Sequence, residues 1–192
     1  LTAIPNNKRK DSGYLLFGIR SLGKTYQDYE NCMIIIAVQY ELKEKLILKS
    51  NFKKIMDYRV CLSSIYKGKK LKKKILTGIS SIDYDKDKDL LLILTSLEGK
   101  DNNIDEMGGF LWTLPVSKLF TKNNKPNIVV KENGKPFNFM HKAEGITKLS
   151  DGSYLIIYDN DEAMGLNKEY KGKLTARTPN QIYYTKLRLV KQ

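Results

Sequence analysis

The chain has 192 residues, of which 41% are hydrophobic, and it carries a formal net charge of +13. This length and apolar content are enough for one domain with a buried core, and they exclude an intrinsically disordered chain. No apolar run approaches the roughly 20 residues of a membrane-spanning helix, so we expect no membrane span. The twelve tyrosines and the short runs of Ile, Leu and Val favour β-strands over helices.

Three stretches of the chain repeat one pattern: a short strand, a polar turn, and a second strand that is almost continuously apolar. The predicted strand pairs are residues 1–4 with 13–21, 78–82 with 90–96, and 145–149 with 153–159. Third strands are predicted at 33–40, 110–114 and 182–189, and weaker fourth strands at 46–48 and 128–130. The acidic segment 83–89 is expected to be a β-turn, because Lys88 and Leu94 stand where an EF-hand calcium loop needs Gly and Glu.

A strand that is apolar at every position needs cover on both of its faces. Stacked β-propeller blades provide that cover, because each blade is packed between two neighbours. We therefore predict an all-β fold of the β-propeller type, with blade units at about residues 1–77, 78–144 and 145–192 in one domain. A closed ring needs at least about four blades, so we expect the missing blades to come from an upstream segment or a second fragment.

Four segments in this order resemble a bacterial family of β-propellers of unknown function, which is distantly similar to esterase-like and phytase-like propellers. The segments are LLFGIRS (15–21), GISSIDYDKDKDLLLILTS (78–96), GGFLWTL (108–114) and HKAEGITKLSDGSYLIIYDND (141–161). The resemblance implies a ring of about six or seven blades, and it implies no settled activity. The lysine-rich stretch and the long loop at 162–179 depart from the family pattern.

His141 and Glu144 are the candidate catalytic residues, because they precede the first strand of the third unit, near the expected mouth of the central channel. An imidazole beside a carboxylate can act as a general base or as a metal ligand. The alternative is that both side chains hydrogen-bond backbone groups where the blade begins. Arg20, which closes a buried strand, could bind a carboxylate or phosphate ligand or pair with an acidic group of the next blade.

Glu144, Asp159 and Asp161 are the candidate metal ligands. Oxygen-rich clusters of this kind suit calcium, and they also suit a solvated turn. Calcium is therefore the one cofactor that the sequence suggests.

The basic residues are densest in the run from Lys67 to Lys74. Such a run attracts polyanions, but this one has little aromatic interleaving and is typical of a solvated hairpin or an outer edge strand. Nucleic-acid binding is therefore disfavoured. The spacing of Cys32 and Cys61 leaves open whether the two cysteines pair.

Two functions are compatible with these features. The favoured one is a binding or scaffold module whose loops at the channel mouth recognise a ligand, because the sequence contains no catalytic signature. The alternative is a calcium-assisted ester or phosphate hydrolase in the central channel. In that hydrolase Arg20 binds the anion, Glu144 or Asp159 holds calcium and His141 moves a proton. The alternative predicts that these side chains converge at one end of the channel.

Overall fold

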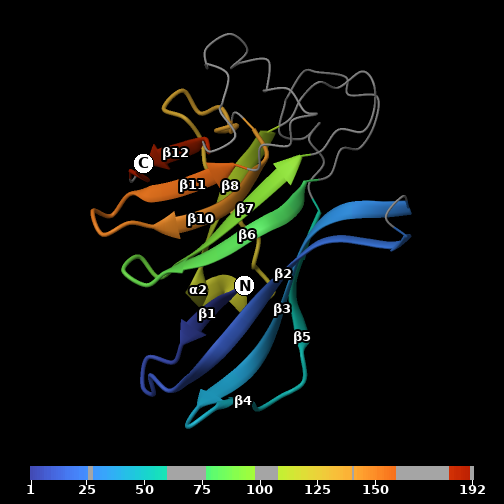
Figure 1. Ribbon diagram of the computed structural model, residues 1–192, viewed down its shortest axis with the longest axis vertical. Coiled ribbons are helices and arrows are strands. Elements are labelled where there is room, and N and C mark those ends of the chain that lie inside the picture. The colour runs from blue at the N-terminus through green and yellow to red at the C-terminus, as the bar shows by residue number, and fades with distance from the viewer. Residues whose placement is uncertain (26–27, 60–76, 98–107, 140, 159–181, 191–192) are drawn as a thin grey trace.

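The computed structural model describes residues 1–25, 28–59, 77–97, 108–139, 141–158 and 182–190. These residues form three antiparallel sheets, and the protein belongs to the all-β class. Figure 1 shows the first sheet at the bottom of the view, the second sheet in the middle and the third sheet at the upper left. Within the described residues, no helix is long and apolar enough to cross a membrane.

The first sheet is a meander in the order β1-β2-β3-β4, and β5 also pairs with β3. Its strands are β1 (Thr2–Pro5), β2 (Ser12–Thr25), β3 (Asp28–Leu42), β4 (Leu46–Leu48) and β5 (Lys53–Tyr58). The long β2–β3 hairpin is its main element, and β3 shares its outer edge between β4 at one end and β5 at the other.

The second and third sheets repeat the same meander. The second has the order β6-β7-β8-β9, with β6 (Gly78–Asp85), β7 (Leu90–Leu97), β8 (Gly108–Pro115) and β9 (Asn127–Ile128). A one-turn helix, α2 (Val116–Leu119), follows β8. The third has the order β10-β11-β12, with β10 (Ala143–Lys148), β11 (Tyr154–Tyr158) and β12 (Tyr184–Leu187).

The predicted strands are present in all three units. A turn joins β6 to β7, but it spans 86–89 and is shorter than the predicted 83–89, since β6 continues to Asp85. The sequence did not indicate β5 or α2. In β5 only Met56 is buried, so its pattern is that of a polar edge strand, and α2 is too short to show a helical period. The lysine-rich run lies outside the described residues.

The second sheet is packed on both faces. Leu91 and Ile93 of β7 belong to a core shared with the first sheet, whereas Leu92 and Leu94 belong to a core shared with the third. All four are 0% exposed. Each such side chain contributes about 1.5–3 kcal/mol by leaving water, which explains why this strand is apolar at consecutive positions.

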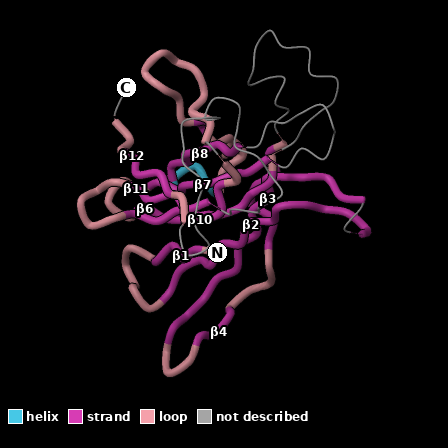
Figure 2. The backbone as a smooth tube through the Cα atoms, turned by 45° about the horizontal axis from the view of Figure 1, so that its top comes forward, coloured by secondary structure: helices cyan, strands magenta, loops and turns pink. Residues whose placement is uncertain are grey.

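Strand β6 lies between the other two sheets, since it packs against β2 on one side and β10 on the other. Figure 2 shows the three meanders brought together around β1, β6 and β10. The approach of β2 to β6 requires Gly18, because a Cβ at that position would lie 2.6 Å from Cγ2 of Ile79.

A buried carboxylate joins the second sheet to the third. Asp85, at the end of β6, is 0% exposed, and Lys148 Nζ lies 2.6 Å from its Oδ1. The Tyr154 hydroxyl donates to Asp85 Oδ2 at 2.5 Å, and the Asp87 backbone N–H donates to Oδ1 at 3.0 Å. Burial disfavours the ionised form, but the hydrogen bonds from Lys148 and Tyr154 outweigh it and lower the pKa of the Asp85 carboxyl.

This arrangement predicts acid-sensitive stability. Because folding lowers the pKa of Asp85, its contribution is present above the unfolded-state pKa of about 3.9 and is lost as the pH falls through the folded-state value. The free energy of unfolding, measured in urea between pH 7 and pH 3, should therefore fall more steeply for the wild type than for Asp85→Asn. Equal slopes would contradict the assignment.

The lysine of this pair gives a second test at neutral pH. Lys148→Met leaves the buried Asp85 carboxylate without its cation, which should cost about 2–4 kcal/mol of unfolding free energy. The control is Lys186→Met, since Lys186 forms an exposed pair with Asp151 at 2.8 Å. That control should cost less than about 1 kcal/mol.

Candidate functional site

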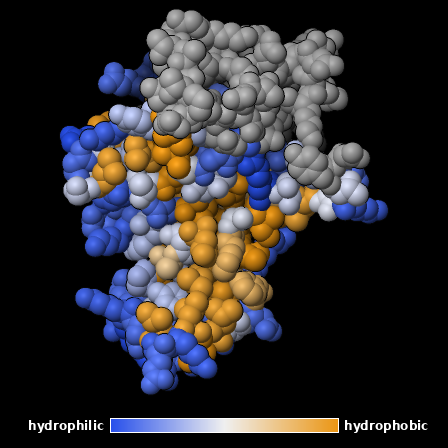
Figure 3. Space-filling model, viewed as in Figure 1, coloured by the Kyte–Doolittle hydropathy of each residue, from blue (hydrophilic) through white to orange (hydrophobic). Residues whose placement is uncertain are grey.

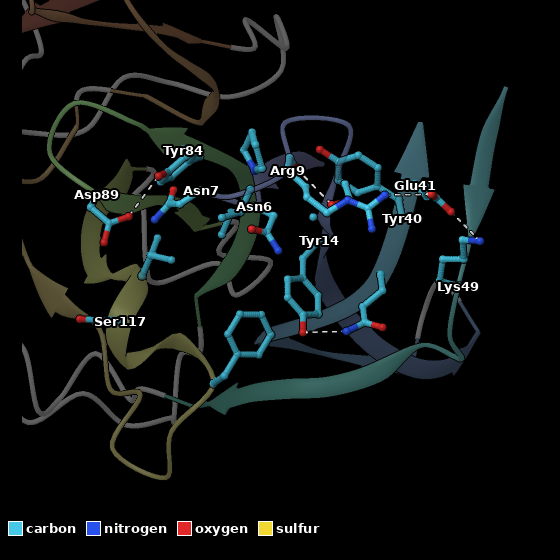
Figure 4. Close-up of a pocket in the computed structure, with 17 residues that line it drawn as sticks. Asn6, Asn7, Arg9, Tyr14, Tyr40, Glu41, Lys49, Tyr84, Asp89 and Ser117 are labelled. Atoms are coloured by element: carbon cyan, nitrogen blue, oxygen red, sulfur yellow. Dashed lines mark hydrogen bonds and ion pairs between the residues drawn. The ribbon is translucent and has the colours of Figure 1, made fainter. Parts of the chain in front are cut away.

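A pocket of about 600 Å³ opens between the first and second sheets. It lies where the β1–β2 turn and the end of β3 face the β6–β7 turn and α2 (Figure 4). In Figure 4, Tyr84 and Asp89 lie on one side, Glu41 and Lys49 on the other, and Asn6 and Asn7 between them. The volume falls within the range of about 300–1,000 Å³ that small-molecule sites occupy.

The β1–β2 turn is ordered by its own hydrogen bonds. The Asn6 backbone N–H donates to the Ser12 carbonyl at 2.7 Å, and the Ser12 backbone N–H donates to the Arg9 carbonyl at 3.1 Å. Asn6 Oδ1 accepts from the Lys8 backbone N–H at 2.8 Å, which is an Asx-type turn. The side chains that this turn presents to the pocket, including Asn7, are therefore held on a preformed loop.

Asp89 anchors the opposite wall. Its backbone has a φ of 51°, a left-handed conformation that Asp adopts more readily than most residues. Its carbonyl accepts the Val116 N–H at 3.0 Å, and its carboxylate accepts the Tyr84 hydroxyl at 3.0 Å. Burial and this hydrogen bond raise the pKa of Tyr84, so the hydroxyl stays protonated at neutral pH.

Glu41 forms a charge cluster at the third side of the pocket. Its carboxylate lies 2.6 Å from Lys49 Nζ, 3.3 Å from Arg9 Nη2 and 3.6 Å from Lys43 Nζ. The hydrogen bond from Lys49, followed by the field of the neighbouring cations, lowers the pKa of Glu41. The Glu41 carboxyl is thus ionised at neutral pH, and the neighbouring cations balance its negative charge.

An aromatic pair completes the lining. The rings of Tyr14 and Phe120 have centroids 4.5 Å apart and planes inclined at 42°. Gln39 Nε2 donates to the Tyr14 hydroxyl at 3.0 Å, which fixes that ring. Phe120 follows α2 and is 48% exposed. The pocket therefore offers an aromatic surface to solvent next to several neutral polar groups.

Two of the residues singled out in the sequence meet at a different place. Arg20 Nη1 lies 3.0 Å from Glu144 Oε1, and Lys142 Nζ lies 3.4 Å from the same oxygen. This pair links the first sheet to the third. Arg20 thus lies beside an acidic group, which was one of its two interpretations from the sequence. Glu144 belongs to β10 of the third sheet, although the predicted bounds place it at the end of the second unit.

The Arg20–Glu144 pair is separate from the pocket. Arg20 stands six positions beyond Tyr14 along β2, and at about 3.3 Å per residue this places it roughly 20 Å further along the strand. His141, close to this pair in sequence, is 1% exposed. The neighbouring carbonyl of Ala143 accepts the Ser80 hydroxyl at 2.6 Å.

The predicted calcium site falls largely outside the described residues. Asp159 and Asp161 both lie there, so their relation to Glu144 stays a prediction. In the part of the chain that the structure describes, no three His, Cys, Asp or Glu side chains are grouped to hold a metal ion. Cys32 is a buried free thiol whose pKa is raised by burial, and Cys61 lies outside the described residues.

The half-exposed pair of Arg20 and Glu144 should contribute only modestly to stability. Their side chains are 31% and 29% exposed, so a double-mutant cycle of Arg20→Ala and Glu144→Ala should give a coupling of about 0.5–1 kcal/mol. The control is Arg188 with Asp151, which are 3.7 Å apart and more exposed, and whose coupling should be near zero. A coupling above about 3 kcal/mol would show that the first pair behaves as a buried one.

Comparisons of the chain with protein-family models, with curated proteins and with solved structures find no match. The resemblance to the bacterial propeller family therefore stays a prediction. What the chain does must be inferred from the pocket and the ion pair themselves.

Proposed function

We propose that this chain is a binding module, part of a β-propeller, which holds its ligand in the pocket between the first and second sheets and breaks no bond. The observation that carries the proposal is the lining of that pocket. Its loop is ordered by internal hydrogen bonds, its charges are compensated, and it exposes an aromatic ring, all of which lower the cost of fixing a ligand.

The propeller part of the proposal is supported by the repeated meander. If each sheet is a blade, β1, β6 and β10 are the inner strands, and the pocket lies at the end of the channel formed by the β1–β2 and β6–β7 turns. The chain would then be related to the bacterial propeller family that its sequence resembles.

Further blades are needed to close such a ring. They would come from an upstream segment or a second fragment and would cover the face of the first sheet that points away from the second. On that face, the half-buried Leu15, Phe17 and Ile19 of β2 stand opposite Val38, Ile36 and Ile34 of β3. Figure 3 shows apolar side chains gathered over the first sheet on the side in view.

The alternative function, a calcium-assisted ester or phosphate hydrolase, is favoured by one observation: Arg20 and Glu144 come together from distant parts of the chain. Two other observations weigh against it. The Glu144 carboxylate is already shared by two cations, which would compete with calcium. His141 is buried, so proton exchange with a ligand in the channel would require local opening.

The binding proposal predicts that small molecules occupy the pocket. A diverse fragment library, screened by ligand-observed NMR, should give hits on the wild type. Ser117→Trp, which adds a bulky side chain to the pocket wall, should lose these hits. Lys122→Trp is the control, because Lys122 is exposed and is not part of the pocket lining. Hits that survive Ser117→Trp would place the binding site elsewhere.

The same protein separates binding from hydrolysis. With calcium present, we expect no release of p-nitrophenol from p-nitrophenyl acetate or p-nitrophenyl phosphate above the buffer rate. Turnover that needs calcium and disappears in Arg20→Ala would replace the binding proposal with the hydrolase.

A further inference from the structure

The charges of the pocket lining leave little for an ionic ligand to gain. The lining holds two cations, Arg9 and Lys49, and two carboxylates, Glu41 and Asp89, so its formal charges sum to zero. Lys49 lies 2.6 Å and Arg9 3.3 Å from the Glu41 carboxylate, and the Asp89 carboxylate accepts the Tyr84 hydroxyl. An anion would have to compete with Glu41 for these cations, and a cation would have to compete with the same cations for Glu41. Breaking such pairs offsets the attraction that a charged ligand would feel. The lining therefore favours a ligand without net charge.

The neutral groups of the lining can both donate and accept hydrogen bonds. The amide of Asn7 and the hydroxyl of Ser117 have this dual capacity, whereas Asn6 offers chiefly its NH2 group, because its Oδ1 accepts the Lys8 backbone N–H. The Tyr84 hydroxyl donates to Asp89 and so presents its oxygen as an acceptor. The ligand groups that match such a set are hydroxyls, because they too donate and accept through one atom.

The aromatic surface favours a ligand that also has an apolar face to pack against it. Phe120 is 48% exposed beside Tyr14, and an exposed ring is stabilised by covering it with C–H groups. A sugar ring combines an apolar C–H face with hydroxyls around its rim. An extended peptide, which would bind by pairing with an edge strand, fits this site less well. The edge strand β1 is only four residues long and ends at Pro5, which has no N–H to donate.

We propose that the pocket binds a neutral saccharide, with one sugar ring stacked on Phe120 and its hydroxyls bonded to Asn6, Asn7 and Tyr84. This inference rests on the proposed binding function and specifies its ligand class. Arg9 and Lys49 take part by neutralising Glu41 and not by binding an anionic group of the ligand.

The test is an array of oligosaccharides, probed with the biotinylated protein on streptavidin so that multivalency raises weak affinities. The array carries neutral oligosaccharides of glucose, galactose, mannose and N-acetylglucosamine, together with sialylated and sulfated ones. We expect neutral oligosaccharides to be retained. Titration of the best of them by calorimetry should show at least about a tenfold weaker Kd for Phe120→Ala.

The matched control is Phe52→Ala. Phe52 is 52% exposed, close to the 48% of Phe120, and it packs edge-on against Phe17 outside the pocket. Its Kd for the same oligosaccharide should stay within about twofold of the wild type. Because both phenylalanines are half exposed, neither variant is expected to unfold the protein, and circular dichroism confirms this before titration.

Three outcomes would overturn the saccharide proposal: retention of no oligosaccharide, retention of acidic ones alone, or equal effects of the two phenylalanine variants. The fragment screen distinguishes failure of the binding function from failure of the saccharide assignment. Fragments that bind in a Ser117-dependent manner without any oligosaccharide would preserve the binding function and remove the saccharide. A proline-rich peptide that binds through Phe120, in place of any oligosaccharide, would show that the aromatic surface serves a protein partner.

Discussion

The fold depends on one constraint: the second sheet has no face that can be left in water. Leu91 and Ile93 point into one core while Leu92 and Leu94 point into the other, and all four are fully buried. Burial of this kind dominates the free energy of folding. The first and third sheets must therefore pack on either side of β7, and the position of every loop at the sheet ends follows from that packing.

The turn between β6 and β7 shows how this packing creates a site. Asp85, where the turn begins, pairs with Lys148 of the third sheet, whereas Asp89, where it ends, supports Tyr84 and α2 at the pocket beside the first sheet. Ionising a buried carboxylate is costly unless hydrogen bonds compensate it, and here they do. One short acidic segment thus bonds the second sheet to the third and shapes the pocket beside the first.

Much of the fold could be predicted from the sequence, because a strand that is buried on both faces has consecutive apolar residues. Strand β7 begins with five consecutive apolar residues, Leu90 to Leu94, and the predicted bounds of β4 are those that it has in the structure. Strand β5 has no such apolar run, since it is an edge strand with one buried side chain. A turn is present within the predicted segment 83–89, but it spans only 86–89, since β6 continues to Asp85. The charge pattern did not reveal that Asp85 points inward to Lys148, 63 residues away.

The candidate site was harder to predict, because tertiary packing alone brings its residues together. The hydrolase alternative predicts that Arg20 and Glu144 converge, but no local pattern indicates their contact, which tertiary packing creates over 124 residues. The pocket was missed, because Asn6 and Asn7 are typical of any turn and Phe120 looks like an ordinary hydrophobic residue. Only the approach of the first sheet to α2 brings these residues together, and no local period encodes that approach.

The division of the β3 edge between two strands has a consequence for the protein's behaviour in concentrated solution. A bare edge of fifteen residues would be a template for other chains. Here β4 pairs with residues 40–42 of that edge, and β5, which carries Lys53 and Lys54, pairs with residues 33–37. The exposed outer edges are therefore short, interrupted and positively charged, which opposes the edge-to-edge addition of strands from which amyloid-like fibrils grow.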